Sequence, residues 1–152
     1  ASSGIDSKWA SEIVILRQRK KDGHIEILLA LYKDSVAEFQ GQWHIPGGYG
    51  KKNDGDFEGT CKRIFLREVG LEVEPIRVVG LPYLWKPGEH PYGFPLSIFT
   101  LCEPLGEVKE TESLRYFPVH DLPSPIVKVH GDFIEEELVI ELTLNSLVRR
   151  VE

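Results

Sequence analysis

The chain has 152 residues, 41% hydrophobic and 28% charged, and no apolar run approaches the ~18 residues of a membrane-spanning helix, which excludes a membrane span and general disorder. Its 18 basic and 24 acidic residues give a formal net charge of -6, which argues against a broad nucleic-acid-binding surface because phosphate backbones require clustered cations. Two cysteines, Cys61 and Cys102, are too few for a disulfide framework and favour a reducing, cytoplasmic location.

Two apolar segments near the start of the chain predict a pair of antiparallel strands. They are EIVILRQ at residues 12–18 and HIEILLALY at residues 24–32, and they flank an Asp-Gly turn at residues 22–23. The stretch WHIPGG at residues 43–48 predicts a short strand. We expect it to end in a Pro-Gly-Gly turn at residues 46–48, where glycine allows backbone angles that other residues avoid.

A polar loop over residues 49–55 leads into the first predicted helix. Asp56 is suited to cap this helix, and Gly70 is suited to end it. The apolar residues that recur at helical spacing are Phe57, Cys61, Ile64, Phe65 and Leu71. We therefore expect a helix over residues 57–69.

Segments rich in β-branched and aromatic residues predict the remaining strands. They are PIRVVGLPYLW at residues 75–85, PLSIFTLCE at residues 95–103 and SLRYFPV at residues 113–119. A loop rich in Pro and Gly, residues 86–94, joins the first two segments.

A capping-box pattern at Asp132 and Glu135 predicts a last helix. Its residues Ile134, Leu138 and Leu142 would face the core. Strands and helices do not alternate strictly, which favours an α/β/α sandwich with a mixed β-sheet between helices over a doubly wound parallel sheet. The length fits one domain over residues 1–152, with residues 1–6 as a disordered or cloning-derived start.

The glycine turn, the polar loop and the capped helix together resemble the Nudix box, G-x5-E-x7-R-E-U-x-E-E-x-G-U with U aliphatic, which commonly follows W-x-x-P-G. The matching residues are Trp43, Pro46, Gly47 and Gly48 before the loop, and Arg63, Glu68, Gly70 and Leu71 after it. One extra residue in the loop is needed for this fit. The resemblance extends to the order of strands and helices over most of the chain, and it implies a Nudix-like fold.

Two acids of the Nudix pattern are replaced in this chain. Ile64 stands where the family has the glutamate after the arginine, and Arg67 replaces the first of the paired glutamates, so Glu68 alone remains. The early glutamate of the box falls at Gly55, between two aspartates. Residues 64 and 68 lie one helical turn apart, so a full box would aim two carboxylates at one cation.

This eroded box resembles that of GDP-mannose mannosyl hydrolase, a Nudix relative that keeps the final glutamate alone. That relative uses a histidine base before a later strand. The corresponding stretch KETESLRYF, residues 109–117, contains no histidine, which argues against cleavage at a sugar carbon.

The resemblance implies a site for Mg²⁺, with Mn²⁺ as an alternative, at the end of the predicted helix. Mg²⁺ is often held by one or two carboxylates and completes its octahedron with carbonyls, waters and substrate phosphates. Glu68 is the first candidate as catalytic metal ligand, and the Gly48 carbonyl would assist it. Glu110 would add a ligand and Glu112 would act as a base, because Nudix enzymes often draw such groups from outside the box. The alternatives are a surface glutamate at 68 and a solvated acidic loop at 110–112.

Further residues would orient the loop or bind substrate. Arg63 would brace the loop by pairing with Asp54, Asp56 or Glu58. Arg67 and Lys51 would hold phosphates. The aromatic residues that could stack on a nucleobase are Tyr83, Trp85, His90, Tyr92 and Phe94. A solvated loop for Lys51 and a core role for the aromatic side chains are the alternatives.

Two functions are compatible with these features. The first is a Mg²⁺-dependent Nudix-type hydrolase of a nucleoside diphosphate linked to another moiety, with a reduced metal site. The second is a catalytically impaired Nudix-fold module that binds a nucleotide or another protein, because the changes at residues 64 and 67 remove two negative charges from the expected cation site. Both imply a nucleotide-derived small molecule as the first ligand to test, and neither excludes a homodimer.

Overall fold

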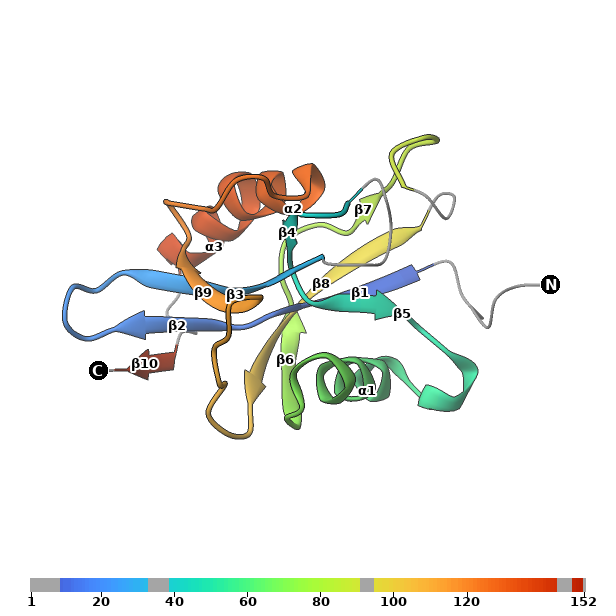
Figure 1. Cartoon of the computed structure of the whole chain (residues 1–152). Coiled ribbons are helices and arrows are strands. Elements are labelled where there is room, and N and C mark those ends of the chain that lie inside the picture. The colour runs from blue at the N-terminus through green and yellow to red at the C-terminus, as the bar shows by residue number, and fades with distance from the viewer. Residues whose placement is uncertain (1–8, 33–38, 91–94, 145–148, 152) are drawn as a thin grey trace. The chain divides into compact units, whose positions relative to one another are not determined.

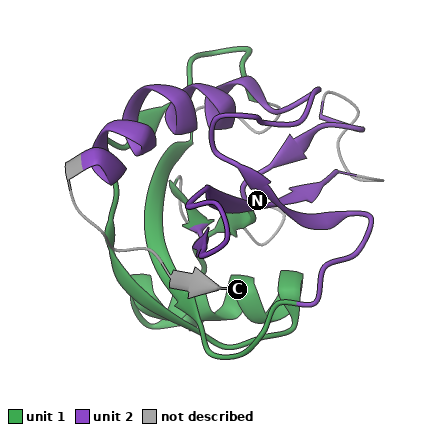
Figure 2. Cartoon of the chain, turned by 90° about the vertical axis from the view of Figure 1, so that its left-hand side faces the viewer, with its two compact units in different colours: residues 1–13, 46–108 green, residues 14–45, 109–152 purple. Residues whose placement is uncertain are grey.

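The computed structural model describes residues 9–32, 39–90, 95–144 and 149–151 (Figure 1). The chain divides into two compact units. Unit 1 comprises residues 1–13 and 46–108, and unit 2 comprises residues 14–45 and 109–152 (Figure 2). Among the residues that the structure describes, no helix is long and apolar enough to cross a membrane.

Unit 1 is built on a sheet with the strand order β5-β1-β8-β6, to which β7 is added by pairing with β8. The strands are β1 (Trp9–Val14), β5 (Gly47–Tyr49), β6 (Val73–Val78), β7 (Tyr83–Leu84) and β8 (Leu96–Pro104). The pairs β1–β5, β6–β8 and β7–β8 are antiparallel. A short 3₁₀ helix, η1 (Lys52–Asp54), leads from β5 into α1 (Phe57–Val69), which packs against β5 and β6.

Helix α1 begins and ends where the sequence predicts. The Asp56 carboxylate accepts a hydrogen bond of 2.7 Å from the Gly59 N–H, and Gly70 ends the helix with a left-handed φ of 83°. The Gly70 N–H also donates to the carbonyls of Phe65 and Leu66, so both ends of the helix satisfy backbone groups that would otherwise be unpaired. The buried residues of α1 are Thr60, Cys61, Ile64 and Phe65. This face packs against the sheet, so the last turn of the helix presents Arg67 and Glu68 to solvent.

The two glycines of the predicted turn lie in strand β5. Gly47 pairs with Glu12 and Gly48 with Ser11, and neither glycine has a positive φ. The expectation that these glycines serve a backbone conformation closed to other residues is therefore wrong. A Cβ at Gly47 would lie 2.6 Å from the Ser11 carbonyl oxygen and would also overlap the Glu12 carboxylate. Glycine is required at position 47 by its close approach to β1.

Unit 2 contains a sheet with the order β10-β2-β3-β4, to which β9 is added by pairing with β3. The strands are β2 (Leu16–Arg19), β3 (Ile25–Leu31), β4 (Trp43–His44), β9 (Leu114–Pro118) and β10 (Arg149–Val151). The β2–β3 hairpin confirms the predicted turn, in which Gly23 has a φ of 72°. Strand β10 pairs with β2 in parallel, whereas β2–β3 is antiparallel. The α/β class with mixed strand pairing is thereby confirmed.

The helical segments of unit 2 follow one another without a break. They are α2 (Lys128–Phe133), the π-helical turn η2 (Ile134–Leu138) and α3 (Val139–Leu144). The capping box predicted at Asp132 and Glu135 is wrong, because both residues lie inside this helical run. The Asp132 carboxylate accepts a hydrogen bond of 2.6 Å from the Lys128 ammonium group, one turn earlier. Ile134 and Leu138 are buried as predicted, and Leu142 is half-buried.

The cap of α1 gives a direct test of this local account. We expect Asp56→Ala to lower the free energy of unfolding by about 1 kcal/mol, because the Gly59 N–H would lose its acceptor. Asp56→Asn keeps a side-chain oxygen at the cap and should stay close to the parent. Urea unfolding followed by circular dichroism measures both variants. Equal losses in the alanine and asparagine variants would contradict the capping role.

Candidate functional site

One carboxylate holds the loop between β5 and α1. Asp54 Oδ2 accepts hydrogen bonds from the Lys51 backbone N–H at 2.8 Å and from the Thr60 hydroxyl at 2.6 Å. Arg63 donates from Nε to Asp54 Oδ1 at 2.5 Å and from Nη2 to Asp54 Oδ2 at 3.1 Å. Arg63 Nη2 also donates to the Tyr49 carbonyl at 2.7 Å. The Arg63 guanidinium thereby joins both ends of the loop to the helix.

These contacts stabilise the ionised form of Asp54, whose side chain is only 3% exposed. The Arg63 guanidinium, assisted by the Thr60 hydroxyl and the Lys51 N–H, holds the pKa of the Asp54 carboxyl well below its ordinary value, against the opposing effect of burial. Of the three acids that the sequence offers to Arg63, the structure selects Asp54. Asp56 caps the helix instead, and Glu58 is exposed.

The last turn of α1 brings Arg67 beside Gly48 of β5, and Glu68 contacts Arg67. Arg67 Nε donates to Glu68 Oε2 at 2.9 Å, and the two side chains are 49% and 34% exposed. Arg67 Nη2 lies 3.0 Å from the position that a Cβ at Gly48 would take. The Ile64 side chain lies 3.5 Å from that same position and is fully buried. The guanidinium therefore lies next to both predicted metal ligands, while an apolar side chain occupies the position of the missing acid.

This donor set fits a divalent cation only if a bound molecule supplies further oxygens. Within the described part of the chain, no three His, Cys, Asp or Glu side chains are grouped so that they could hold a metal ion. Glu68 provides one carboxylate, which is the lower limit for a Mg²⁺ site that also uses substrate phosphates. The Arg67 guanidinium, 2.9 Å from that carboxylate, also opposes the approach of a bare cation.

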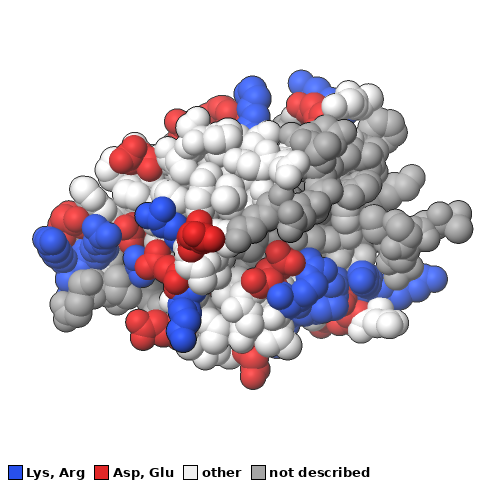
Figure 3. All heavy atoms as spheres, in the orientation of Figure 1, with Lys and Arg blue, Asp and Glu red and all other residues white. Residues whose placement is uncertain are grey.

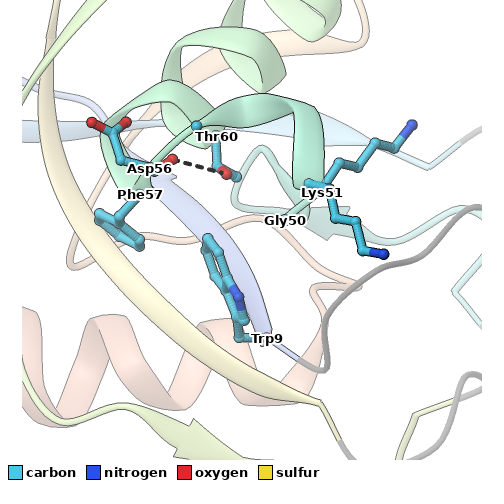
Figure 4. A pocket seen from close by; sticks show the side chains of 8 residues that line it. Trp9, Gly50, Lys51, Asp56, Phe57 and Thr60 are labelled. Carbon is cyan, nitrogen blue, oxygen red and sulfur yellow. Dashed lines mark hydrogen bonds between the residues drawn. The ribbon is translucent and has the colours of Figure 1, made fainter.

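Lys51 lies near the other end of α1. It lines a cavity of about 290 Å³ together with Trp9 and Phe57. The rings of these two aromatic residues face one another in this cavity (Figure 4), with 5.5 Å between their centroids. The helical positions from Phe57 to Glu68 span about 16 Å along the axis, at ~1.5 Å per residue. Lys51 and Glu68 therefore lie at opposite ends of the helix. Sequence reasoning did not identify Trp9, which lies far from the loop along the chain.

Three of the predicted stacking residues, Tyr83, Trp85 and His90, form a packed cluster in unit 1. Trp85 makes edge-to-face contacts with Tyr83, at 5.8 Å between ring centroids, and with His90, at 4.7 Å. Trp85 is 4% exposed, and its indole N–H donates to the Ser97 hydroxyl at 2.8 Å. Tyr83 is half-buried, and its hydroxyl donates to Glu89. Tyr92 and Phe94 lie outside the described residues. The Trp85 ring is therefore packed inside unit 1 and does not present an open surface for stacking.

A buried carboxylate that sequence reasoning missed lies beside this cluster. Glu12 is 7% exposed, and its Oε2 accepts a hydrogen bond of 2.8 Å from the Ser97 hydroxyl. The chain of hydrogen bonds therefore runs from Trp85 through Ser97 to Glu12, whose other oxygen faces Gly47. The only feature of the sequence that could have indicated this buried carboxylate is the position of a charged residue at the start of the apolar run EIVIL.

The acids predicted outside the box belong to unit 2, whereas Glu68 belongs to unit 1. Glu110 Oε1 accepts the Tyr116 N–H at 3.0 Å, and its Oε2 lies 3.5 Å from Arg17 Nη2. The Arg17 guanidinium also lies 3.8 Å from the centroid of the Tyr116 ring. Glu110 therefore contacts the middle of β9 within its own unit. Glu112 is exposed in the turn that precedes β9.

The hydrogen bonds of Asp54 should make the free energy of unfolding depend on pH. We expect Asp54→Asn to lower the free energy of unfolding at neutral pH by about 1 to 2 kcal/mol, because it removes charge-assisted hydrogen bonds. The folded-state pKa of Asp54 lies below the ordinary value of 3.8, so the stability that it contributes is present above that pH and is lost as the pH falls.

Urea unfolding of the parent and of Asp54→Asn at a series of pH values tests this expectation. The gap in free energy between the two proteins should narrow as the pH drops below 3.8. Arg63→Gln removes the main cause of the lowered pKa of Asp54. The difference in unfolding free energy between the parent and Arg63→Gln should therefore also become smaller as the pH falls. A gap that stays constant throughout the acid range would contradict the role assigned to the pair.

Figure 3 shows the charged side chains on one face of the molecule. Among the residues coloured there, acidic and basic side chains are interspersed. This distribution agrees with the formal net charge of -6.

Solved structures share this fold at low sequence identity. A mutT/nudix family protein from Listeria innocua matches with a TM-score of 0.64 and 18% identity, over 91% of this chain and 95% of that chain. An ADP-ribose pyrophosphatase from Streptococcus suis matches with a TM-score of 0.61 and 23% identity, over 94% of this chain and 96% of that chain.

The protein NrtR of Shewanella oneidensis matches with a TM-score of 0.58 and 18% identity over 85% of this chain. This chain spans only 61% of NrtR. The isolated Nudix domain of NrtR, in complex with ADP ribose, matches with a TM-score of 0.62 and 17% identity, over 95% of this chain and 94% of that chain. These identities show a shared fold and no more.

The sequence itself matches a known domain family. The comparison with curated proteins gave no match. Residues 9–136, which include parts of both units, match the family described as NUDIX domain. This match covers most of the chain and agrees with the residues that resemble the box, and it shows that the chain belongs to the Nudix family.

Proposed function

We propose that the chain is a hydrolase of a nucleoside diphosphate linked to another moiety, and that it acts with Mg²⁺ or Mn²⁺ bound jointly by protein and substrate. The observation that carries this proposal is the solvent-exposed pair of Glu68 and Arg67, in which Arg67 lies beside Gly48. The likeness of the eroded box to that of GDP-mannose mannosyl hydrolase, which keeps the same single glutamate, supports it.

The two charged residues at the end of α1 would have different roles in binding the diphosphate: Arg67 would bind phosphate oxygens and Glu68 would bind the cation. The planar guanidinium of Arg67 can donate two parallel hydrogen bonds to phosphate oxygens, and it supplies positive charge that a site with few carboxylates cannot gather from metal ions alone. Glu68 and the Gly48 carbonyl would hold the cation. When bound, the cation polarises the diphosphate and offsets the negative charge that develops as water attacks.

Arg63 is a positioning residue in this account. Its hydrogen bonds to Asp54 and Tyr49 fix the loop against α1, so Gly48, the neighbour of Tyr49, would be held relative to α1 before a ligand arrives. A preorganised site gains rate because its groups need not be ordered during the reaction.

Two of the similar structures suggest which ligands to try first. One is described as an ADP-ribose pyrophosphatase and another as a Nudix domain in complex with ADP ribose. ADP-ribose contains a diphosphate that links a nucleoside to a second group, which is the chemistry that the Arg67 and Glu68 side chains suit. ADP-ribose, nucleotide sugars and dinucleoside polyphosphates therefore form the test panel.

We expect Glu68→Gln to lower kcat/KM on the best substrate of this panel by at least about 100-fold, because it removes the carboxylate that holds the cation. The measurement is release of a nucleoside monophosphate in the presence of Mg²⁺. The matched control is Glu58→Gln, which removes an exposed glutamate from the first turn of the same helix and should keep the activity of the parent. If Glu68→Gln were as active as the parent, the proposed role of Glu68 would be wrong.

A second candidate function is a binding module without turnover. The observation that favours it is the hydrogen-bonded pair of Arg67 and Glu68, in which a guanidinium already neutralises the remaining acid. In such a module the guanidinium would replace the metal ion as the partner of the diphosphate.

Calorimetry with ADP-ribose, with Mg²⁺ or with EDTA, separates the two functions. The hydrolase proposal predicts that EDTA weakens binding by about tenfold or more, because Glu68 and the Gly48 carbonyl would hold the ligand through the cation. We expect Arg67→Gln to weaken binding in both conditions by about tenfold, the effect of one charge-assisted hydrogen bond. Equal affinity in EDTA and in Mg²⁺, with no product formed, would support the binding module and would contradict the hydrolase.

A further inference from the structure

A cavity of about 290 Å³ lies between the start of β1, the loop after β5 and the first turn of α1, and we call it the Trp9 cavity. The proposed hydrolase function does not use it, because Phe57 in its wall and Glu68 lie about 16 Å apart along α1, at ~1.5 Å per residue. Its volume is close to the lower limit for ligand pockets, about 300 Å³, which suits one planar ring system with one acidic group. Its described lining residues all belong to unit 1.

The apolar wall of the Trp9 cavity is a pair of aromatic rings. Trp9 is the first residue of β1 and Phe57 is the first residue of α1, and both side chains are half-buried. Their ring centroids lie 5.5 Å apart, and the ring planes are inclined by 33°. At this separation the two rings already contact each other. A planar ligand would therefore stack on the pair and would not insert between the rings.

The loop backbone approaches the Trp9 ring closely at Gly50. A Cβ at Gly50 would overlap the indole, since Trp9 Cε2 would lie only 2.7 Å away, and Gly50 has no positive φ. The Gly50 N–H also donates to the Trp9 carbonyl at 3.3 Å. Glycine is therefore required at position 50 to make room for the indole. The loop and β1 hold the Trp9 ring in place before a ligand binds.

The polar rim of the Trp9 cavity carries more positive than negative charge. Lys51 and Lys52 line the cavity, and both are exposed. Asp56 also lines it, but its carboxylate is engaged as the cap of α1. In the view of Figure 4, the Trp9 ring lies between Phe57 and Lys51. An acidic group attached to a ring that stacks on Trp9 would therefore lie toward the lysine side chains, whose ammonium groups each carry three hydrogen-bond donors.

We propose that the Trp9 cavity binds a nucleoside monophosphate, with the base stacked on the aromatic pair and the phosphate held by Lys51 and Lys52. Stacking of a base on aromatic side chains is favourable for every base, so this wall does not select one. A phosphate monoester carries nearly two negative charges at neutral pH, which suits two ammonium groups better than a carboxylate does. The net charge of -6 disfavours a longer polyanion such as a nucleic acid.

This site and the proposed diphosphate site differ in their need for a metal ion. Ammonium groups would bind the phosphate in the Trp9 cavity, so its affinity for a nucleoside monophosphate should be the same in Mg²⁺ and in EDTA. Arg67 and Glu68 lie at the far end of α1, so a ligand in the cavity would not contact them. The inference therefore does not depend on the proposed hydrolase function, and either one can fail without the other.

Nuclear magnetic resonance on the ¹⁵N-labelled full chain locates the ligand. The chain has three tryptophans, and the indole N–H signal of Trp9 is identified by its absence in Trp9→Phe. In EDTA, AMP should shift the Trp9 signal in a saturable way, whereas the signal of Trp85, which is buried, should stay in place. Adenosine and inorganic phosphate should each bind at least about tenfold more weakly than AMP, because each lacks one of the two contacts. Absence of a saturable Trp9 shift, or equal affinity for adenosine and AMP, would overturn the proposal.

The contribution of the lysines is measured by calorimetry with AMP in EDTA. The double variant Lys51→Gln with Lys52→Gln should bind AMP about tenfold more weakly and adenosine as the parent does, because it removes only the phosphate contacts. The matched control is the double variant Lys20→Gln with Lys21→Gln, which removes two exposed, adjacent lysines from the turn between β2 and β3 in unit 2. This control changes the net charge by the same amount and should keep the affinity of the parent.

The contribution of stacking is measured in the same way with Trp9→Leu. This variant keeps an apolar side chain but removes the indole, and it should weaken the binding of both AMP and adenosine by about tenfold. Circular dichroism verifies that each variant is folded. If the folded Lys51→Gln, Lys52→Gln protein bound AMP as tightly as its control, or if folded Trp9→Leu bound AMP as the parent does, the proposed site would be wrong.

Discussion

Four hydrogen bonds converge on the Asp54 carboxylate, two of them from the Arg63 guanidinium. Because Arg63 also holds the Tyr49 carbonyl, this contact fixes the glycine-containing strand β5 and the start of α1 in one arrangement. Because α1 is a continuous helix, fixing its first part relative to β5 also fixes the positions of the residues in its last turn. The proximity of Arg67 to Gly48 therefore depends on the contact of Asp54 with Arg63, which lies about one helical turn before Arg67.

The changes in the Nudix box alter its charge more than its architecture. Replacement of two glutamates by Ile64 and Arg67 leaves Glu68 with a hydrogen-bonded cation of its own. A site of this kind attracts free Mg²⁺ weakly, but it favours an anion that can pair with the guanidinium and bring a cation with it. Substrate and metal would then bind together. This is the physical reason for preferring a ligand-completed site to a preformed one.

Local signals in the sequence were sufficient for α1, because a side-chain cap, a periodic apolar face and a terminal glycine all act within a few residues. Tertiary contacts decided the features that were missed. Gly47 is needed because Glu12 and the Ser11 carbonyl lie against it, and no local pattern shows that approach. The false capping box arose because Asp132 pairs with Lys128 inside the helix. The sequence identified Asp54, Asp56 and Glu58 as candidate partners of Arg63. It could not show which of them pairs with Arg63, because that depends on the direction of each side chain.

The central claim is that Glu68 and Arg67 act together on a diphosphate. A crystal structure with Mg²⁺ and a methylene-bridged analogue of ADP-ribose tests it most directly, because the analogue cannot be hydrolysed. The account predicts a cation about 2.1 Å from a Glu68 carboxylate oxygen and from a diphosphate oxygen, with the Arg67 guanidinium turned onto the phosphates. An analogue bound elsewhere, or bound at α1 with no cation while Arg67 stays paired to Glu68, would contradict it.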